Sequence, residues 1–444
     1  MYTITQKTSL INKAQSSAEN ARLQFFLLCV LWVFHSFKPE WTIPGLRFIS
    51  PLQTLIQLIL LLLLFLYPSK KFENPLTKYF FLFLVLMILS SAFARNTGLP
   101  RNIVRGTSLL FVTYLATITF ANNEKRTFLL FNIFIYGNLL IAILGIKGEG
   151  LARGVAIFAD QNDLALNMNI FLPIVLFLGI GEKNKVKKIF YFILAGTFLT
   201  ATIISFSRGG FVGLVAVLLF AWLKLPISKL KSLFVILLII LAMAYFAPKS
   251  FWDEMLTIEE GSQESTAAGR IYFWRVAVRE FLDNPIIGVG VMNFGVWYPD
   301  YIKPDDAMSD GRAIPGHIRD WGRVCHSIYF TLLSELGIIG VLLFMLMLYQ
   351  FYKEVRFDNG LLNSQHSLNC IKEGGVATKD QLMLNLQKCH NLGLGLMGGM
   401  IGFLVSGVFL SVLYYPQFWL MCSLGVALGN CKRKIIKEEN IVFD

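Results

Sequence analysis

The sequence predicts an all-α membrane protein with about 12 transmembrane helices and one large loop on the outer, extracytoplasmic side. Composition is the first reason: 55% of the 444 residues are hydrophobic and only 15% are charged, whereas about a quarter of a soluble protein is charged. Long uncharged runs are the second, for example LQTLIQLILLLLLFLY from Leu52 to Tyr67. With short flanks such runs approach the ~20 apolar residues that cross a bilayer core. Unbroken runs favour helices over a barrel, whose strands would alternate.

Apolar runs divide the chain into spans and loops. They predict spans at residues 23–37, 52–67, 76–94, 103–121, 127–146, 164–180, 188–206, 210–225, 231–247, 327–350, 392–413 and 415–430. The predicted organisation is a cytoplasmic tail at 1–22, helices 1–9 within 23–247, a large loop at 248–325, helix 10 at 326–350, a cytoplasmic loop at 351–391, helices 11–12 within 392–430 and a second cytoplasmic tail at 431–444.

The distribution of positive charge sets the predicted orientation. With the N-terminus inside, the cytoplasmic segments hold 24 Lys and Arg, and the opposite side holds 16, of which eight belong to the long loop 248–325. Short cytoplasmic loops of membrane proteins collect Lys and Arg, so both termini are predicted to be cytoplasmic. The net charge of +12 is therefore interpreted as topology, and no nucleic-acid partner is expected.

The large loop contains one predicted amphipathic helix, at residues 268–282 (AGRIYFWRVAVREFL). Ile271, Trp274, Val278 and Phe281 recur at helical spacing and are predicted to form its apolar stripe. Asn284-Pro285 is expected to end the helix.

Polar residues just before the sixth span form the first candidate cluster. The segment ARGVAIFADQNDLA holds Arg153, Asp160 and Asn162, and an arginine fork suits phosphate oxygens. The alternative is that Asn162 or Asp163 only caps the following helix.

Two further clusters are built on arginines. Arg208 lies in SFSRGG, a minimal turn at the predicted outer surface whose glycines permit close approach of a ligand or backbone. Arg270 opens the amphipathic helix, where free backbone N–H groups and the helix dipole favour an anion. Lipid-headgroup contact for Arg208 and a surface salt bridge for Arg270 are the alternatives.

The fourth candidate is His326, which begins a span at the outer boundary in HSIYFTLLSELGIIG. An imidazole can take a proton near neutral pH, so His326 is predicted to act as a base; the alternative is a structural histidine. Tyr329 in the same segment is a supporting candidate. Glu335 lies about 13 Å further along the helix, so it is interpreted as an interhelical packing partner. No regular metal-ligand spacing and no Walker loop occur, so neither a metal nor another cofactor is expected.

Together these motifs resemble the O-antigen ligase and O-antigen polymerase superfamily of bacterial membrane proteins. HSIYFTLLSELGIIG resembles its histidine signature, SFSRGG its arginine turn, and GRIYFWRVAVREFLDNPIIGVGVMNF the arginine segment of its periplasmic loop. FADQNDLALNMNIFLP resembles the sequence before a mid-chain span, above all in the exosortase-associated O-glycosylation ligase branch, although Gln161 stands where many relatives carry Pro.

The resemblance implies a GT-C-like glycosyltransferase of the bacterial inner membrane that works on the periplasmic face without a required metal. Its donor would be a glycan on undecaprenyl diphosphate, and its acceptor a hydroxyl of lipid A core, of a glycan or of a protein. By motif, His326 would be the base and Arg208 and Arg270 would hold the diphosphate, with Arg153, Asn162 and Asp160 as extensions.

Several functions remain open at this point. A ligase is the first reading, and a polymerase that uses the same donor twice, or a protein O-oligosaccharyltransferase, would employ the same residues. A lipid or glycan transporter is the alternative from another class. Transporters place polar residues near the bilayer midplane on broken helices, whereas the candidate residues here are predicted to lie at one face of the membrane.

Overall fold

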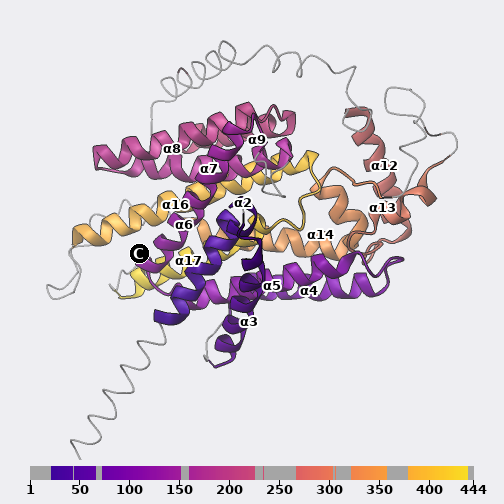
Figure 1. Ribbon diagram of the computed structural model, residues 1–444, viewed down its shortest axis with the longest axis horizontal. Helices are drawn as coiled ribbons and strands as arrows, with labels where there is room; N and C mark the ends of the chain where they lie inside the picture. Colours follow the sequence, from indigo (N-terminus) through magenta and orange to yellow (C-terminus); the bar gives the residue numbers. More distant parts are fainter. Residues whose placement is uncertain are drawn as a thin grey trace, which may run out of the picture.

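A computed structural model describes residues 22–43, 45–66, 73–151, 160–225, 234, 267–303, 306, 322–357 and 379–438 (Figure 1). Within these residues the regular structure is helical and no strand occurs. Every predicted span that falls on described residues overlaps a helix, and 231–247 lies outside them apart from residue 234. The longer helices are Arg22–Phe37, α3 (Ser50–Leu66), α4 (Pro75–Ala92), α5 (Pro100–Phe120), α6 (Glu124–Lys147), α7 (Gln161–Gly181), α8 (Lys185–Ile204), α9 (Arg208–Lys224), α12 (Ala267–Asp283), α14 (Ile328–Val355), α16 (Lys379–Ser406) and α17 (Pro416–Glu438). Short turns of helix are α2 (Pro39–Thr42), η1 (Arg47–Ile49), α13 (Phe294–Trp297), η3 (Tyr298–Tyr301) and η6 (Gly407–Phe409).

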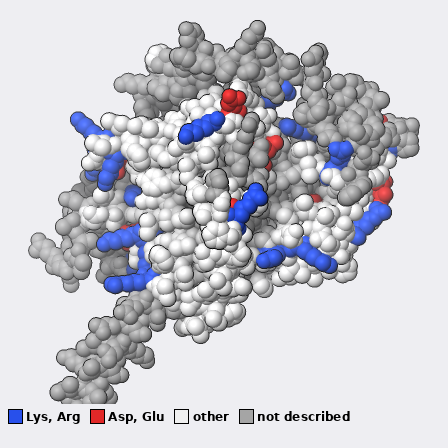
Figure 2. Space-filling model, viewed as in Figure 1, with Lys and Arg blue, Asp and Glu red and all other residues white. Residues whose placement is uncertain are grey.

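The helices carry the signature of a membrane protein. Eight of those described are long and apolar enough to cross a bilayer. Large apolar side chains also point outward, including Phe65 at 81% exposure and Val186 at 76%, which suits lipid rather than water. Figure 2 shows basic side chains at the left of this view and again toward the right, with much uncharged surface between them. These features support the prediction that the chain is a membrane protein. The count of about 12 spans stays a prediction.

Asparagine caps start several helices at the predicted cytoplasmic end. Asn74, Asn123 and Asn184 each accept a hydrogen bond from a backbone N–H in the first turn of α4, α6 and α8. The first-turn N–H groups of a helix have no intrahelical partner, so such caps stabilise its start by about 1 kcal/mol.

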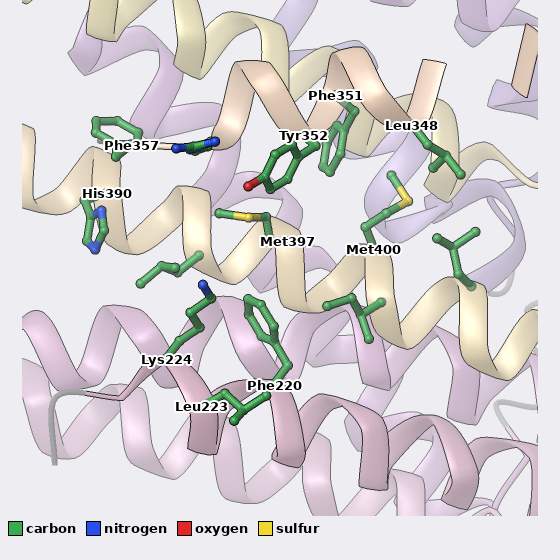
Figure 3. Close-up of a pocket in the computed structure, with 14 residues that line it drawn as sticks. Phe220, Leu223, Lys224, Leu348, Phe351, Tyr352, Phe357, His390, Met397 and Met400 are labelled. Atoms are coloured by element: carbon green, nitrogen blue, oxygen red, sulfur yellow. The ribbon is translucent and has the colours of Figure 1, made fainter. Parts of the chain in front are cut away.

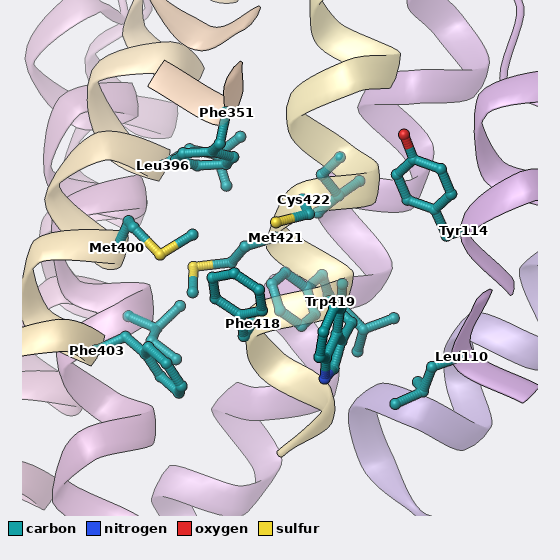
Figure 4. Packing of buried hydrophobic residues seen from close by; sticks show 14 of the residues in the cluster. Leu110, Tyr114, Phe351, Leu396, Met400, Phe403, Phe418, Trp419, Met421 and Cys422 are labelled. Carbon is teal, nitrogen blue, oxygen red and sulfur yellow. The ribbon is translucent and has the colours of Figure 1, made fainter. Parts of the chain in front are cut away.

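Helix α17 lies at the centre of the apolar core (Figure 4). Trp419 is 1% exposed and stacks on Phe80 of α4 with ring centroids 4.2 Å apart. Phe418 stacks on Phe344 of α14 at 5.0 Å. The hydrophobic pairs thus join helices that are far apart in the sequence.

Helix α16 packs closely on α7 through a stripe of glycines. A Cβ added to Gly395, Gly399 or Gly402 would lie 2.6–2.7 Å from a backbone atom of α7. Small residues let membrane helices approach in this way. The prediction that a span covers 392–413 is wrong at its end, because the α-helix stops at Ser406 and residues 410–415 form a loop.

A buried amide joins the same two helices to α9. Asn169 of α7 is fully buried, and its Nδ2 donates to the carbonyl of Gly210 at 2.7 Å and to Ser406 Oγ at 3.2 Å. Because polar groups in hydrocarbon are costly unless hydrogen-bonded, this contact fixes the register of three helices at once.

Helix α14 is broken at Gly337, and part of the large loop fills the break. Gly337 has φ +62°, and a Cβ there would lie 2.6 Å from the backbone of Ile286. The N–H of Ile338 donates to the carbonyl of Pro285, and Val289 N–H donates to the carbonyl of Ser334, both at 2.8 Å. Loop backbone therefore satisfies α14 groups that the helix itself leaves open, as a non-helical segment among membrane helices requires.

Helix α12 confirms the predicted amphipathic helix and its end before Asn284, but the predicted stripe is wrong by about one position. The buried face consists of Tyr272, Phe273, Val276, Ala277 and Glu280, whereas Ile271 is exposed. The two aromatic rings pack against Tyr298 and form a second apolar cluster with Phe294 and Cys325. Helical periodicity alone allows either of two adjacent faces to be buried. The packing of α12 on α13 and α14 decides which of the two faces it is.

We expect Gly337→Ala to destabilise the protein by about 1–3 kcal/mol, because a non-glycine residue at positive φ is strained and its Cβ would meet Ile286. The matched control is Gly196→Ala in α8, where an added Cβ meets nothing within 4 Å. The control should be neutral or stabilising by roughly 0.5–1 kcal/mol. Thermal unfolding in detergent would measure both, and equal midpoints for the two variants would contradict the role of the break.

A second prediction concerns Glu280, which is fully buried in α12. Burial, and then the nearby Glu335, raises the pKa of Glu280 to about 10, so the carboxyl is neutral at pH 7. Because the folded-state pKa lies above the ordinary 4.5, stability falls as pH rises above that ordinary value.

Glu280→Gln removes this titration, so the variant should match wild type near pH 5 and unfold at a higher temperature near pH 9. Thermal midpoints across this range provide the test. A variant that kept the full wild-type slope would show that Glu280 does not titrate in this way.

Candidate functional site

Two of the predicted arginines line one cavity, which we call the arginine cavity. Its volume is about 380 Å³. It lies at the end of the bundle where α7, α9 and α12 begin and η6 ends. The lining residues are Gln161, Asn162, Phe206, Arg208, Gly209, Val212, Arg270, Ile271, Trp274 and Phe409.

The first wall of the arginine cavity is the start of α7. Asp160 is the N-cap, and its Oδ1 accepts from the N–H of Asn162 at 2.7 Å and of Asp163 at 3.4 Å. The alternative that Asn162 or Asp163 provides the cap is therefore wrong. Asn162 instead accepts a hydrogen bond from Ser207 Oγ at 2.6 Å, which ties the start of α7 to the start of α9.

The second wall is the start of α9, which SFSRGG forms. Ser207 is the N-cap and accepts from the N–H of Gly210 at 2.9 Å. Arg208 is the first helical residue and lines the cavity. Of the two glycines, Gly210 lies against Ala165 of α7 and Gly209 faces Phe409. The glycines thus permit helix packing as well as access to the cavity.

The third wall is the first turn of α12. Arg270 is partly buried, its Cζ lies 5.7 Å from the centroid of the Phe409 ring, and no hydrogen-bond partner for its Nε exists among the described residues. Burial, and then the charge of Arg208, lowers the pKa of Arg270, while Asp160 opposes this. Because a guanidinium stays protonated in proteins, two positive charges meet in this cavity.

Three helix starts therefore contribute to one cavity. Gln161 and Arg208 are the first residues of α7 and α9, and Arg270 lies in the first turn of α12. Helix N-termini present free N–H groups and a positive dipole end, so they favour anions. The arrangement can hold a phosphate-bearing group through guanidinium forks and helix dipoles together.

His326 lies beside the helix of Arg270, although it is not among the residues that line the arginine cavity. Its ring centroid is 5.9 Å from that of Phe273, one helical turn beyond Arg270. Its backbone N–H donates to Ser411 Oγ at 2.8 Å, and its φ is +52°. Left-handed backbone at a non-glycine residue is uncommon and is held only by its surroundings.

The remaining candidates fall elsewhere. Tyr329 donates to the carbonyl of Leu404 at 3.0 Å and does not line the arginine cavity. Arg153 lies outside the described residues. Glu335 accepts from Tyr414 OH at 2.7 Å and from Met292 N–H at 2.8 Å. Both partners lie in loops, so the carboxyl ties α14 to two loops, and its interpretation as an interhelical partner is wrong.

The sequence did not predict the loop 410–415 or the aromatic residues that line the arginine cavity. Ser411 holds the backbone of His326, and Tyr415 OH donates to Asp163 at 2.9 Å. Trp274, which lines the arginine cavity, stacks on Phe330 of α14 at 5.0 Å. The polar pair Ser406 and Ser411 is a local signal that the span ends near Ser406, but it does not point to His326.

Comparison with known proteins gives two matches. Residues 190–345 match the family described as O-antigen ligase, and this region contains Arg208, Arg270 and His326. The chain is also 24% identical over 200 residues to a Rickettsia conorii protein named "Putative polysaccharide ligase". That match covers 44% of this chain and 46% of the relative, so the chain spans less than half of its length. Together the two matches support the resemblance of this chain to the O-antigen ligase superfamily.

Proposed function

We propose that the protein is a membrane glycosyltransferase of the O-antigen ligase type. It transfers a glycan from undecaprenyl diphosphate to an acceptor hydroxyl, such as that of lipid A core, on the periplasmic face of the inner membrane. The observation that carries the proposal is the arginine cavity, in which Arg208 and Arg270 meet at three helix starts.

The reaction assigns one task to each part of the site. The acceptor oxygen attacks the anomeric carbon of the first sugar, and the bond from that carbon to the diphosphate oxygen breaks. His326 takes the proton of the acceptor hydroxyl. Arg208 and Arg270 stabilise the negative charge that develops on the leaving diphosphate, the largest single contribution in many transfer reactions.

The placement of His326 beside α12 supports this division of labour. Arg270 and Phe273 are one turn apart on α12, and the Phe273 ring contacts the imidazole. The sugar would bridge the arginine cavity and the histidine, so the diphosphate and the attacked carbon need not occupy the same space. Ser411 and the left-handed backbone fix the histidine before substrate binds, as preorganised catalysis requires.

The broken α14 bears on the transporter alternative. Broken helices are typical of transporters when the break lines a polar binding site. Here the backbone of residues 285–290 occupies the break and makes its hydrogen bonds. The break therefore anchors the loop that carries Arg270, which favours the transferase.

Alanine variants at Arg208 and Arg270 should lower the rate constant of transfer about 100-fold each, because each removes a donor to the developing charge. His326→Ala should lower it by about 100- to 10,000-fold. The assay is glycan transfer by purified full-length protein from an undecaprenyl diphosphate-linked donor.

Arg101→Ala is the matched control, since Arg101 is an exposed arginine near the start of α5, on the same predicted face. Full activity of His326→Ala would remove the proposed base, and full activity of both arginine variants would reject the diphosphate site.

Glycans from a deletion strain distinguish the ligase from a polymerase. For a ligase, we expect long polymer on the lipid carrier and a bare acceptor, and the wild-type gene should restore the attached polymer. Single repeat units that reach the acceptor, without long chains, would instead identify a polymerase. Loss of a glycoprotein with normal lipid-linked products would identify a protein acceptor.

A further inference from the structure

A second and larger cavity shares helix α9 with the arginine cavity, and we call it the basic groove. Its volume is about 700 Å³, and α9, α14 and α16 form its walls (Figure 3). Its lining residues are Phe220, Leu223, Lys224, Leu348, Phe351, Tyr352, Arg356, Phe357, His390, Leu394, Met397, Met400, Ile401 and Leu404.

The basic groove is apolar along most of its length. On α16 it runs from His390 to Leu404, which is about 21 Å at 1.5 Å per residue. This is longer than one leaflet, about half of the ~30 Å hydrocarbon core. Leucine, methionine and phenylalanine side chains dominate its walls, so the groove can take a flexible acyl chain.

One end of the groove is positively charged. Lys224 and Arg356 line it, and Lys432 lies beside them, with Nζ 4.8 Å from the Phe357 ring and donating to the carbonyl of Arg356 at 2.6 Å. His390 lines the same end, and its Nδ1 is buried with no hydrogen-bond partner among the described residues. Figure 3 shows Lys224, His390 and Phe357 at one end and Leu348 and Met400 at the other.

This end lies opposite the arginine cavity. Arg208 and Val212 line the arginine cavity near the start of α9, whereas Phe220 and Lys224 line the groove at the end of the same helix. By the predicted topology the charged end faces the cytoplasm, where basic pockets between membrane helices bind anionic headgroups.

We propose that the basic groove binds one anionic glycerophospholipid of the cytoplasmic leaflet. Its phosphate would contact Lys224 and Arg356, and one acyl chain would lie along α16 over Met397 and Met400. The donor's polyprenyl tail is the rival occupant. Its diphosphate belongs at the opposite end, so that tail would bring no anion to the charged end. The charge therefore selects the phospholipid.

The test is native mass spectrometry of the delipidated full-length protein during titration with phosphatidylglycerol. The double variant Lys224→Gln/Arg356→Gln should raise the apparent Kd about 10- to 30-fold, because each cation near a membrane surface contributes about a factor of five. Lys353→Gln is the matched control, since Lys353 lies on α14 near the same end, over the Tyr349 ring, and does not line the groove. It should leave the Kd within about twofold.

A filling variant keeps the test decisive if the charge variant does not fold. Met397→Trp places an indole in the groove with every charge retained, and it should also abolish tight phosphatidylglycerol binding. Unchanged binding in a folded charge variant or in Met397→Trp would overturn the proposal, as would equal binding of zwitterionic phosphatidylcholine. One-for-one displacement of phosphatidylglycerol by undecaprenyl diphosphate would assign the groove to the donor tail instead. Binding requires no transfer reaction, so this test is independent of the proposed function.

Discussion

The hydrogen bonds of the Asn169 amide are the contact on which the rest of the site depends. They join α7 to the carbonyl of Gly210 in α9 and to Ser406 at the end of α16. Among apolar helices such a buried amide has few alternative partners, so a shift of any of the three helices would weaken the hydrogen bonds of its Nδ2. The same three helices provide Asn162, Arg208 and, just beyond Ser406, Phe409. The packing of these helices in the membrane core thus sets the distances between the residues that line the arginine cavity.

The large loop is attached to this core by a different device. Residues 285–290 enter the break of α14 and make backbone hydrogen bonds at Ser334 and Ile338. Helix α12 leads directly into this segment, so Arg270 is held against Arg208 although some sixty residues separate them in sequence. A loop that only covered the surface could not keep two like charges together. Backbone hydrogen bonds suit that task, because they immobilise no side-chain rotamers and so cost no side-chain entropy.

The sequence was informative where a local rule decides the outcome. Apolar runs located the helices, and the arginine turn became a candidate because an arginine is out of place on the predicted outer surface. It failed where tertiary packing decides. The buried face of α12 shifted from Ile271 to Tyr272, and the cap of α7 moved to Asp160. Neither the break at Gly337 nor Ser411 behind His326 leaves a local signal, because the partner of each lies far away in the chain.

The two ends of α9 show why the arginine cavity and the basic groove differ although both are cationic. At its start, Arg208 acts together with the positive end of the helix dipole, which suits a compact, multiply charged diphosphate. At its end the dipole is negative, and a cation such as Lys224 partly neutralises it. The net positive potential at this end is therefore weaker. It suits a single phosphate diester, and the adjoining basic groove is long enough for an acyl chain. Under the two proposals, the same helix therefore serves a leaving diphosphate at its start and a retained phospholipid at its end.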